Sequence, residues 1–280
     1  MKGVLTFLRR FGRNRAALAG SVFLLGIYVV TVFAPVIVPQ DPYRMNLREK
    51  LESPSSKHLL GTDELGRDVL SRIMLGTRIS LTVGFIAAGI SAVVGVTMGL
   101  VAGYFSGIID TLIMGLVDLL MSFPPFLLIL AVVAIVPPSL VNIMVVLGLT
   151  MWSQYARIVR GNILTVKEQD FVEAARALGA GNLRIMWRHL LPNVMAPVIV
   201  VATLNVAGAI LLESGLSFLG FGAQPPTPSW GNMIATGRVY LRQAPHIATS
   251  AGMAIFLTVL AFNLVGDGLR DVLDPRLKGY

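Results

Sequence analysis

The stretch Glu173-Ala-Ala-Arg-Ala-Leu-Gly179, continuing to Leu191-Pro192, is a charged segment set between long apolar runs. Thr165 and Glu168 have the S/T-x-x-E spacing of a capping box, so we predict that a helix begins there. Gly179 can adopt the left-handed conformation that ends such a helix. The segment is therefore predicted to form a pair of short helices joined at this glycine.

Apolar periodicity places the apolar side chains of each of these two helices on one face. These faces are Phe171, Val172, Ala175 and Leu178 in the first helix, and Leu183, Met186, Trp187 and Leu190 in the second. Asn182 is predicted to cap the second helix, and Pro192 to end that helix or to begin the next one. Such a polar projection on a membrane protein is expected to contact another molecule.

The same segment resembles the cytoplasmic signature of the permease subunits of ABC importers. That signature reads E-A-A, three residues, G, nine residues, I-x-L-P, and it is matched by Glu173, Ala174, Ala175, Gly179, Leu191 and Pro192. The isoleucine position holds His189, which is similar to the dipeptide/oligopeptide/nickel branch of the family. The resemblance implies that the segment, including Leu178 and Asn182, is a coupling helix seated in a cleft of an ATPase subunit.

Composition supports a membrane protein. Of 280 residues, 55% are hydrophobic and 14% are charged, and the mean hydropathy is +0.74, which is too apolar for an ordinary soluble domain. The absence of cysteine excludes disulfides and thiol chemistry. The net charge of +8 fits basic flanks on the cytoplasmic side better than nucleic-acid binding, because no basic patch stands apart from the apolar stretches.

A membrane span needs about 20 mostly apolar residues. Six stretches qualify: Ala16–Val38, Ile79–Tyr104, Ile109–Val136, Leu140–Val159, Val194–Ser214 and Ile247–Val265. The first is predicted to be an uncleaved span rather than a signal peptide, because its apolar part is long and no A-x-A site closes it. Pro124-Pro125 should kink or break the third. We therefore predict an all-α polytopic membrane protein with about six transmembrane helices and a cytoplasmic coupling-helix segment.

Six spans place both termini on one side, and the basic flanks make that side cytoplasmic. We expect a multi-pass protein of a bacterial or archaeal inner or plasma membrane. The expected divisions are a cytoplasmic tail (1–15), a first transmembrane helix (16–38), an extracytoplasmic loop (39–78) and a permease core (79–280). The core would hold five helices, a coupling segment (160–192) and an extracytoplasmic loop (215–246).

Two outer segments, His58–Asp68 and Leu216–Trp230, resemble blocks of the second-subunit type of this permease branch. The resemblance implies that these loops face an extracytoplasmic substrate-binding protein. The alternative is that their glycines, prolines and tryptophan only shape re-entrant loops or plugs.

Small residues recur every four positions in the second predicted span: Ala87, Ser91, Gly95, Gly99 and Gly103. Such a stripe lets helix backbones approach closely in lipid, so Ser91, Gly95, Gly99 and Gly103 are predicted helix-packing positions. Gly84 lies off the stripe.

Ionisable residues inside spans are costly and are functional candidates. Asp118 and Glu213 are predicted to line a pathway or to pair with a partner subunit, whereas Asp110 and Asp267 are interpreted as interfacial anchors. Three asparagines in the spans are expected to donate interhelical hydrogen bonds, namely Asn142, Asn205 and Asn263.

Catalytic chemistry is not predicted on this chain. No G-x-x-x-x-G-K-[ST] cradle occurs, and His58, His189 and His246 lack metal-ligand spacing, so we expect no catalytic residue, metal site or cofactor here. The resemblance implies partners instead: a homologous permease in a heterodimer, two ATP-binding subunits that carry ATP and Mg, and a binding protein. Membrane lipid surrounds the complex, and no nucleic acid is expected.

The resemblance further implies import of di- or oligopeptides, with nickel or a nickel chelate as the alternative cargo. A stand-alone secondary transporter or channel would need internal repeats, and none is convincing. A membrane-anchored DNA-binding protein is a further class, but acids offset the bases of the predicted helix pair: Glu168, Asp170 and Glu173 beside Arg176, Arg184 and Arg188.

Overall fold

The computed structural model describes residues 10–273 of the chain. Within that range the protein is built from helices without a β-strand, and one isolated β-bridge joins Thr62 and Asp68. In chain order the elements are α2 (Arg15–Ile37), η1 (Leu47–Glu49), α3 (Val69–Phe105), α4 (Gly107–Ser122), α5 (Pro125–Val133), α6 (Leu140–Val166), α7 (Asp170–Ala177), α8 (Asn182–Arg184), η2 (Ile185–Leu190), α9 (Leu191–Phe218), α10 (Trp230–Gly237), η3 (Arg238–Tyr240) and α11 (Pro245–Leu273). The outermost parts of the predicted cytoplasmic tails lie outside the described residues.

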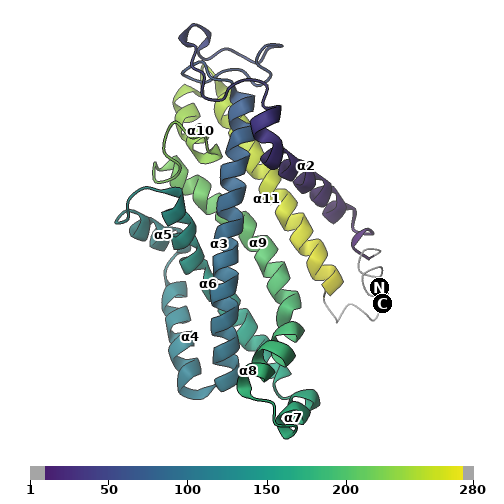
Figure 1. Cartoon of the computed structure of the whole chain (residues 1–280). Helices are drawn as coiled ribbons and strands as arrows, with labels where there is room; N and C mark the ends of the chain where they lie inside the picture. Colours follow the sequence, from purple (N-terminus) through teal and green to yellow (C-terminus); the bar gives the residue numbers. More distant parts are fainter. Residues whose placement is uncertain (1–9, 274–280) are drawn as a thin grey trace.

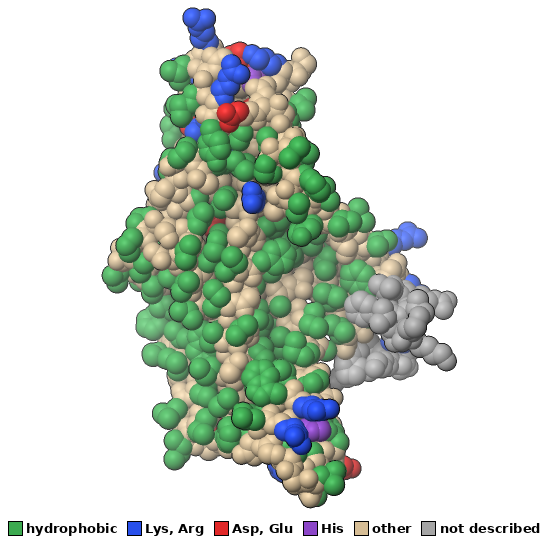
Figure 2. Space-filling view, viewed as in Figure 1, with side chains coloured by type: hydrophobic (Ala, Val, Ile, Leu, Met, Phe, Trp, Pro, Cys, Tyr) green, Lys and Arg blue, Asp and Glu red, His purple; other side chains and the backbone are tan. Residues whose placement is uncertain are grey.

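The long helices lie side by side in an elongated bundle (Figure 1), with the 39–68 loop at one end and α7 at the other. Figure 2 shows hydrophobic side chains over the middle of one face, while most charged side chains gather towards its two ends. Apolar material in the middle and charges at the ends are the arrangement expected of a bundle that crosses a bilayer.

Among the described residues, four helices are long and apolar enough to cross a membrane: α2, α3, the continuous run Asn182–Phe218 and α11. The pair α4 and α5 passes as a fifth if the two halves form one bent span. The remaining predicted span, Leu140–Val159, corresponds to α6, whose 27 residues exceed the required length. Its second half carries Arg157 and Arg160, which make it less apolar than the other long helices.

The proline pair breaks the third span as predicted. Helix α4 ends at Ser122, Pro125 begins α5, and the two helices are bent by 90°. Pro125 suits the first turn of a helix because the amide hydrogen it lacks has no intrahelical partner there.

Helices α3 and α6 form the closest helix pair of the bundle, and the small residues of α3 lie at their contact. A Cβ added at Gly95 would lie 2.3 Å from the Trp152 carbonyl oxygen, and one at Gly99 would lie 2.5 Å from that of Ala156. Ser91 Oγ donates to the Gly148 carbonyl at 2.9 Å. At Gly103 an added Cβ would meet Ile163 at 2.8 Å. The small side chains at these positions allow the backbones of α3 and α6 to approach each other closely.

Gly84 is also tightly packed, although it lies off the stripe. A Cβ there would be 2.9 Å from Ile210 Cγ1 and 3.3 Å from Val206 of α9. Helix α3 therefore uses small residues on two faces, one against α6 and one against α9, and the sequence periodicity identifies only the first.

Candidate coupling surface and membrane pathway

The segment between α6 and α9, residues 167–190, is named the connector here. Gly179 has φ +79°, so the left-handed turn predicted at this position is present. Its amide donates to the Arg176 carbonyl at 2.9 Å, and the Ala180 amide donates to the Ala175 carbonyl at 3.0 Å. This pair of bonds is a Schellman motif, which satisfies the last carbonyls of α7 and turns the chain away.

The inner face of the connector is anchored in the main core. Val172, Ile185, Met186 and Leu190 are buried in one cluster with side chains of α3 and α6, among them Leu100, Tyr155, Val159 and Ile163. Polar contacts add to this anchor. Tyr104 donates to Asn182 Oδ1 at 2.8 Å, and Lys167 Nζ donates to Ser106 Oγ at 2.7 Å. The connector is thereby packed and hydrogen-bonded against the long helices α3 and α6.

The outer face of the connector is uncovered and apolar. Leu178 is 89% exposed, Leu183 69% and Trp187 50%. The apolar faces that the sequence predicts are therefore only partly buried: Phe171, Leu178, Leu183 and Trp187 are exposed, whereas Val172, Ala175, Met186 and Leu190 are buried. Glu173, Ala174, Gly179 and Pro192 are exposed, Ala175 is buried, and His189 is half-buried.

Two capping predictions are wrong. Thr165 and Glu168 form no capping box, because α6 continues through Val166 and α7 starts after Gln169, whose side chain does not cap it. Asn182 is the first residue of α8 rather than its cap, which is Gly181. The Asn182 side chain is occupied by Tyr104 instead.

Pro192 begins a helix and does not stop one. Residues Asn182–Phe218 form one continuous helical run, and η2 within it is a π-helical turn. The Leu191 amide donates to the Met186 carbonyl, five residues back. This wider turn lets the backbone enter α9 despite the amide hydrogen that Pro192 lacks.

Two acids of α4 pair with two arginines of α6. Asp110 accepts from Arg160 Nε at 2.5 Å and from its Nη2 at 2.6 Å. Asp118, further along α4, pairs with Arg157 Nη2, and both side chains of this second pair are about half exposed or more. A charged pair facing lipid is costly, so its open side fits a water-filled pathway or a partner chain.

Glu213 lies inside the chain. It is fully buried and accepts hydrogen bonds from Ser217 Oγ at 2.6 Å and Ser80 Oγ at 3.2 Å. The residue joins α9 to α3, with no exposed face towards a pathway or a second subunit. Asp118 is thus the acid of the predicted pair that has an open side.

The loop between α2 and α3, residues 39–68, folds into a compact unit named the outer cap. Asp63 accepts from Arg67 Nε at 2.7 Å and lies 3.3 Å from Arg72 Nε. His58 Nδ1 is 2.9 Å from Asp68 Oδ1, and Asp68 also caps α3. All five side chains are buried. Helix α3 therefore starts ten residues before the predicted span, inside the cap.

Trp230 of the other outer segment is fully buried, and its Nε1 donates to the Ile73 carbonyl at 3.1 Å. This contact ties α10 to α3. Because its side chain is buried against α3, Trp230 fits a role in shaping the outer segment better than contact with a binding protein.

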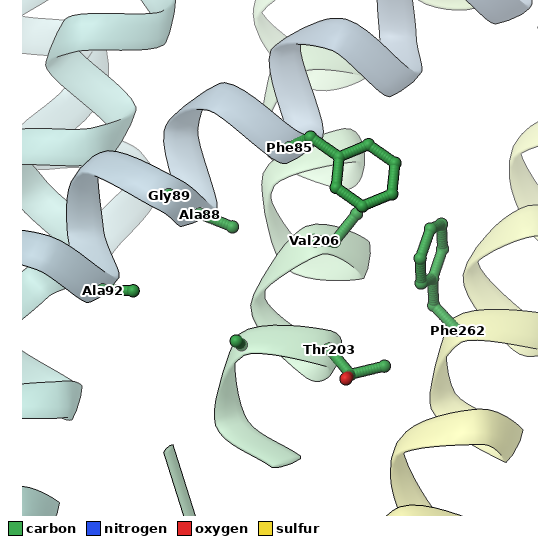
Figure 3. A pocket seen from close by; sticks show the side chains of 8 residues that line it. Phe85, Ala88, Gly89, Ala92, Thr203, Val206 and Phe262 are labelled. Carbon is green, nitrogen blue, oxygen red and sulfur yellow. The ribbon is translucent and has the colours of Figure 1, made fainter. Parts of the chain in front are cut away.

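Two of the pockets among the helices of the bundle have contrasting linings. The first, of about 280 Å³, lies between α3, α9 and α11 and has one polar side chain, Thr203 (Figure 3). Phe85 and Phe262 meet edge to face there, with ring centroids 5.9 Å apart. The second, of about 430 Å³, lies between α4, α6 and α9 and is lined in part by Gln154, Arg157 and Asn205. The second of these two offers more hydrogen-bonding side chains for a polar cargo.

Sequence comparisons identify the family. Residues 95–279 match the binding-protein-dependent transport system inner membrane component, and residues 5–54 match the N-terminal transmembrane domain of oligopeptide transport permease C. The chain belongs to the binding-protein-dependent transport system inner membrane components. It is therefore a membrane-spanning permease subunit of an ABC importer and not the ATP-hydrolysing subunit.

Individual relatives of this permease family cover almost the whole chain. The glutathione transport system permease protein GsiD of Pectobacterium atrosepticum is 44% identical over 97% of this chain and 91% of its own length. The di/tripeptide transport system permease protein DppC of Pseudomonas aeruginosa is 44% identical over 97% and 92%, and the dipeptide permease DppC of Alkalihalophilus pseudofirmus is 40% identical over 96% and 89%.

A solved structure supports the fold. A chain of the inward-facing MetNI methionine ABC transporter superposes with a TM-score of 0.58 at 18% identity, covering 72% of this chain and 96% of that one. At this identity the likeness concerns the permease fold alone.

Proposed function

We propose that this chain is one of two homologous permease subunits of an importer of di- and oligopeptides. Two ATP-binding subunits, which carry ATP and Mg, would bind on the connector side, and an extracytoplasmic binding protein would deliver cargo to the outer cap. The cargo is inferred from the names of relatives that match nearly the full chain, which are permeases for dipeptides, di/tripeptides and glutathione.

The observation that carries the proposal is the two-sided connector. Its inner face is fixed in the core of α3 and α6, while its outer face leaves Leu178, Leu183 and Trp187 uncovered. Large apolar side chains grouped on a projection mark an interaction site. An ATPase seated there would move the connector, and the anchored inner face would pass that movement to the spans.

Orientation is the second part of the proposal: the connector and both termini face the cytoplasm, and the outer cap faces outside. The cysteine-free chain allows a direct test with an impermeant thiol reagent in intact cells. Leu59→Cys, at a 61% exposed position of the cap, should be labelled, whereas Glu173→Cys should be labelled only after the membrane is opened. Labelling of Glu173→Cys in intact cells would reverse the topology.

Transport itself is tested by reconstituting the full complex in liposomes with its binding protein. Uptake of a labelled dipeptide and ATP hydrolysis are measured together. The proposal expects ATP-dependent dipeptide uptake that stops when the binding protein is omitted. Binding-protein-dependent ATP hydrolysis with a different cargo would leave the importer assignment standing and remove the peptide assignment.

A further inference from the structure

The pocket between α4, α6 and α9 is lined by an asparagine, Asn205, whose amide nitrogen has no hydrogen-bond partner among residues 10–273. Asn205 is 7% exposed, and its Nδ2 is buried without a hydrogen-bond partner among the described residues. The hydroxyl of Tyr155 is also buried; it interacts with Asn205, but it forms no hydrogen bond of standard geometry with any described residue. An asparagine amide has two N–H donors, so pairing with this hydroxyl would still leave a donor free.

The other two asparagines of the predicted spans both have hydrogen-bond partners, so the unpartnered amide is particular to the position of Asn205. Asn142 Nδ2 donates to the Pro137 carbonyl at 2.8 Å, and Asn263 Nδ2 donates to the Val259 carbonyl of its own helix at 2.8 Å. Neither makes the predicted interhelical bond, because each finds a nearby backbone acceptor. Asn205 alone of the three is buried without one, and it lines a polar pocket.

Arg157 supplies a cation to the same pocket. Its Nη2 is held by Asp118, and a guanidinium has five N–H donors, so most of them stay available. Gln154, one turn earlier on α6, adds a further amide. A cation flanked by amide donors is the environment that a carboxylate prefers.

Position and size suit a cargo in transit. Asn205 lies near the middle of α9, and the pocket volume of about 430 Å³ falls within the range of about 300–1,000 Å³ for small-molecule sites. The Asp118–Arg157 ion pair beside the pocket is about half exposed or more. Because exposed charges are costly in lipid, this side of the bundle is expected to face water or a partner chain.

We propose that this pocket is a peptide subsite of the translocation pathway, in which Asn205 and Arg157 donate hydrogen bonds to the terminal carboxylate of a short peptide. The proposal rests on the peptide-import function above. Asp118 acts as a positioning residue, because it holds the guanidinium against the pocket through a hydrogen bond.

The first test uses accessibility in nanodiscs, where both faces of the full permease–ATPase complex are open to solution. Met121→Cys places a thiol on the pocket lining at a 41% exposed position, and Met253→Cys on α11 is the matched control at 54%. A free-carboxylate dipeptide should slow modification of Met121→Cys by a water-soluble thiosulfonate. Its C-terminal amide should slow it less, and neither should affect Met253→Cys. Equal protection by acid and amide overturns the carboxylate assignment.

The second test removes the amide. Asn205→Leu should abolish dipeptide protection of Met121→Cys and reduce dipeptide uptake in liposomes at least about tenfold, as expected for a lost hydrogen bond to a charged group. Asn263→Leu is the matched control and should leave both unchanged. Because Asn205→Leu removes an unsatisfied buried donor, the complex should assemble, which binding-protein-stimulated ATP hydrolysis verifies.

Different results would contradict the peptide subsite and the peptide-import function. If the unaltered complex imports dipeptide but the peptide gives no protection, or if Asn205→Leu retains full uptake and protection, the subsite is wrong and the import function stands. If the unaltered complex imports no peptide, the import function itself fails.

Discussion

The outer cap and the connector both lie beyond the apolar middle of the bundle, but they are stabilised in opposite ways. In the cap, charged side chains are buried and paired: Asp63 contacts Arg67 and Arg72, and Asp68 contacts His58. In the connector, no residue forms an ion pair with another described residue, and the large apolar side chains of its outer face are exposed.

This difference indicates which end of the bundle leaves a surface available for another protein. The cap pairs its buried aspartates with basic side chains of the same chain. The connector has a fixed inner face and an outer face whose burial would be favourable by about 25 cal/mol per Å² of apolar surface. The exposed apolar face of the connector thus supports the proposed ATPase interface, whereas the cap has no comparable argument for a bound partner.

The largest expected effect comes from opening the cap. Asp63→Ala would leave Arg67 and Arg72 buried without their shared carboxylate, and breaking a buried pair in this way costs about 3–5 kcal/mol. We expect a clear fall in the unfolding temperature and in the yield of purified complex. The control is Glu52→Ala, which removes an exposed carboxylate from the same loop, where only the Glu52 backbone is used. Similar losses for both variants would show that the buried network does not hold the cap.

A smaller but more specific effect is expected at the connector. The double variant Leu178→Ser and Leu183→Ser should fold normally, because both side chains are exposed, but it should bind the ATPase at least about tenfold more weakly. Leu59→Ser, at a comparably exposed leucine of the cap, should leave ATPase binding unchanged. Co-purification with titrated ATPase measures this. Unchanged binding by the double variant would remove the connector's interface role.

Features that depend on local sequence could be predicted. The turn at Gly179 follows from one residue type at a helix end, and the α3–α6 contact follows from a four-residue repeat. The break at Pro125 follows from a missing amide hydrogen. In each case the signal and the structure lie within a few residues of each other, so no tertiary contact can override it.

Features decided by tertiary contacts could not be predicted in this way. The capping box at Thr165 fails because packing of α6 on α3 carries that helix through Val166. The polar pocket joins Met121, Gln154 and Asn205 from three helices that are far apart in the sequence. The only sequence signal for this pocket is the presence of polar side chains within apolar spans. From the sequence, the asparagines among them are expected to form interhelical hydrogen bonds, not a shared pocket.

A backbone variant separates conformation from contact in the connector. Gly179 and Gly181 both have open space around an added Cβ, but only Gly179 has a positive φ. Gly179→Val should therefore cost about 1 kcal/mol or more in backbone strain, shift the connector and reduce dipeptide uptake, whereas Gly181→Val should not strain the backbone. Uptake and ATP hydrolysis measured together in liposomes test this. If the two variants behave alike, the effect comes from a collision with the ATPase and not from the turn.

The smallest expected effect is a pH dependence confined to the cap. The Lys57 ammonium donates a hydrogen bond to Glu49 and holds the pKa of that carboxyl below its usual range. A lowered folded-state pKa means that the pair stabilises the cap above the unfolded pKa of about 4.3, and that this contribution is lost as the pH falls through the folded value. Unfolding temperatures of the unaltered chain and of Lys57→Met should differ slightly at neutral pH and converge in acid. The contribution is small because the pair is at the surface, where salt should screen it further. A difference that grows as the pH falls would reverse the sign and show that Lys57 does not stabilise the ionised form of Glu49.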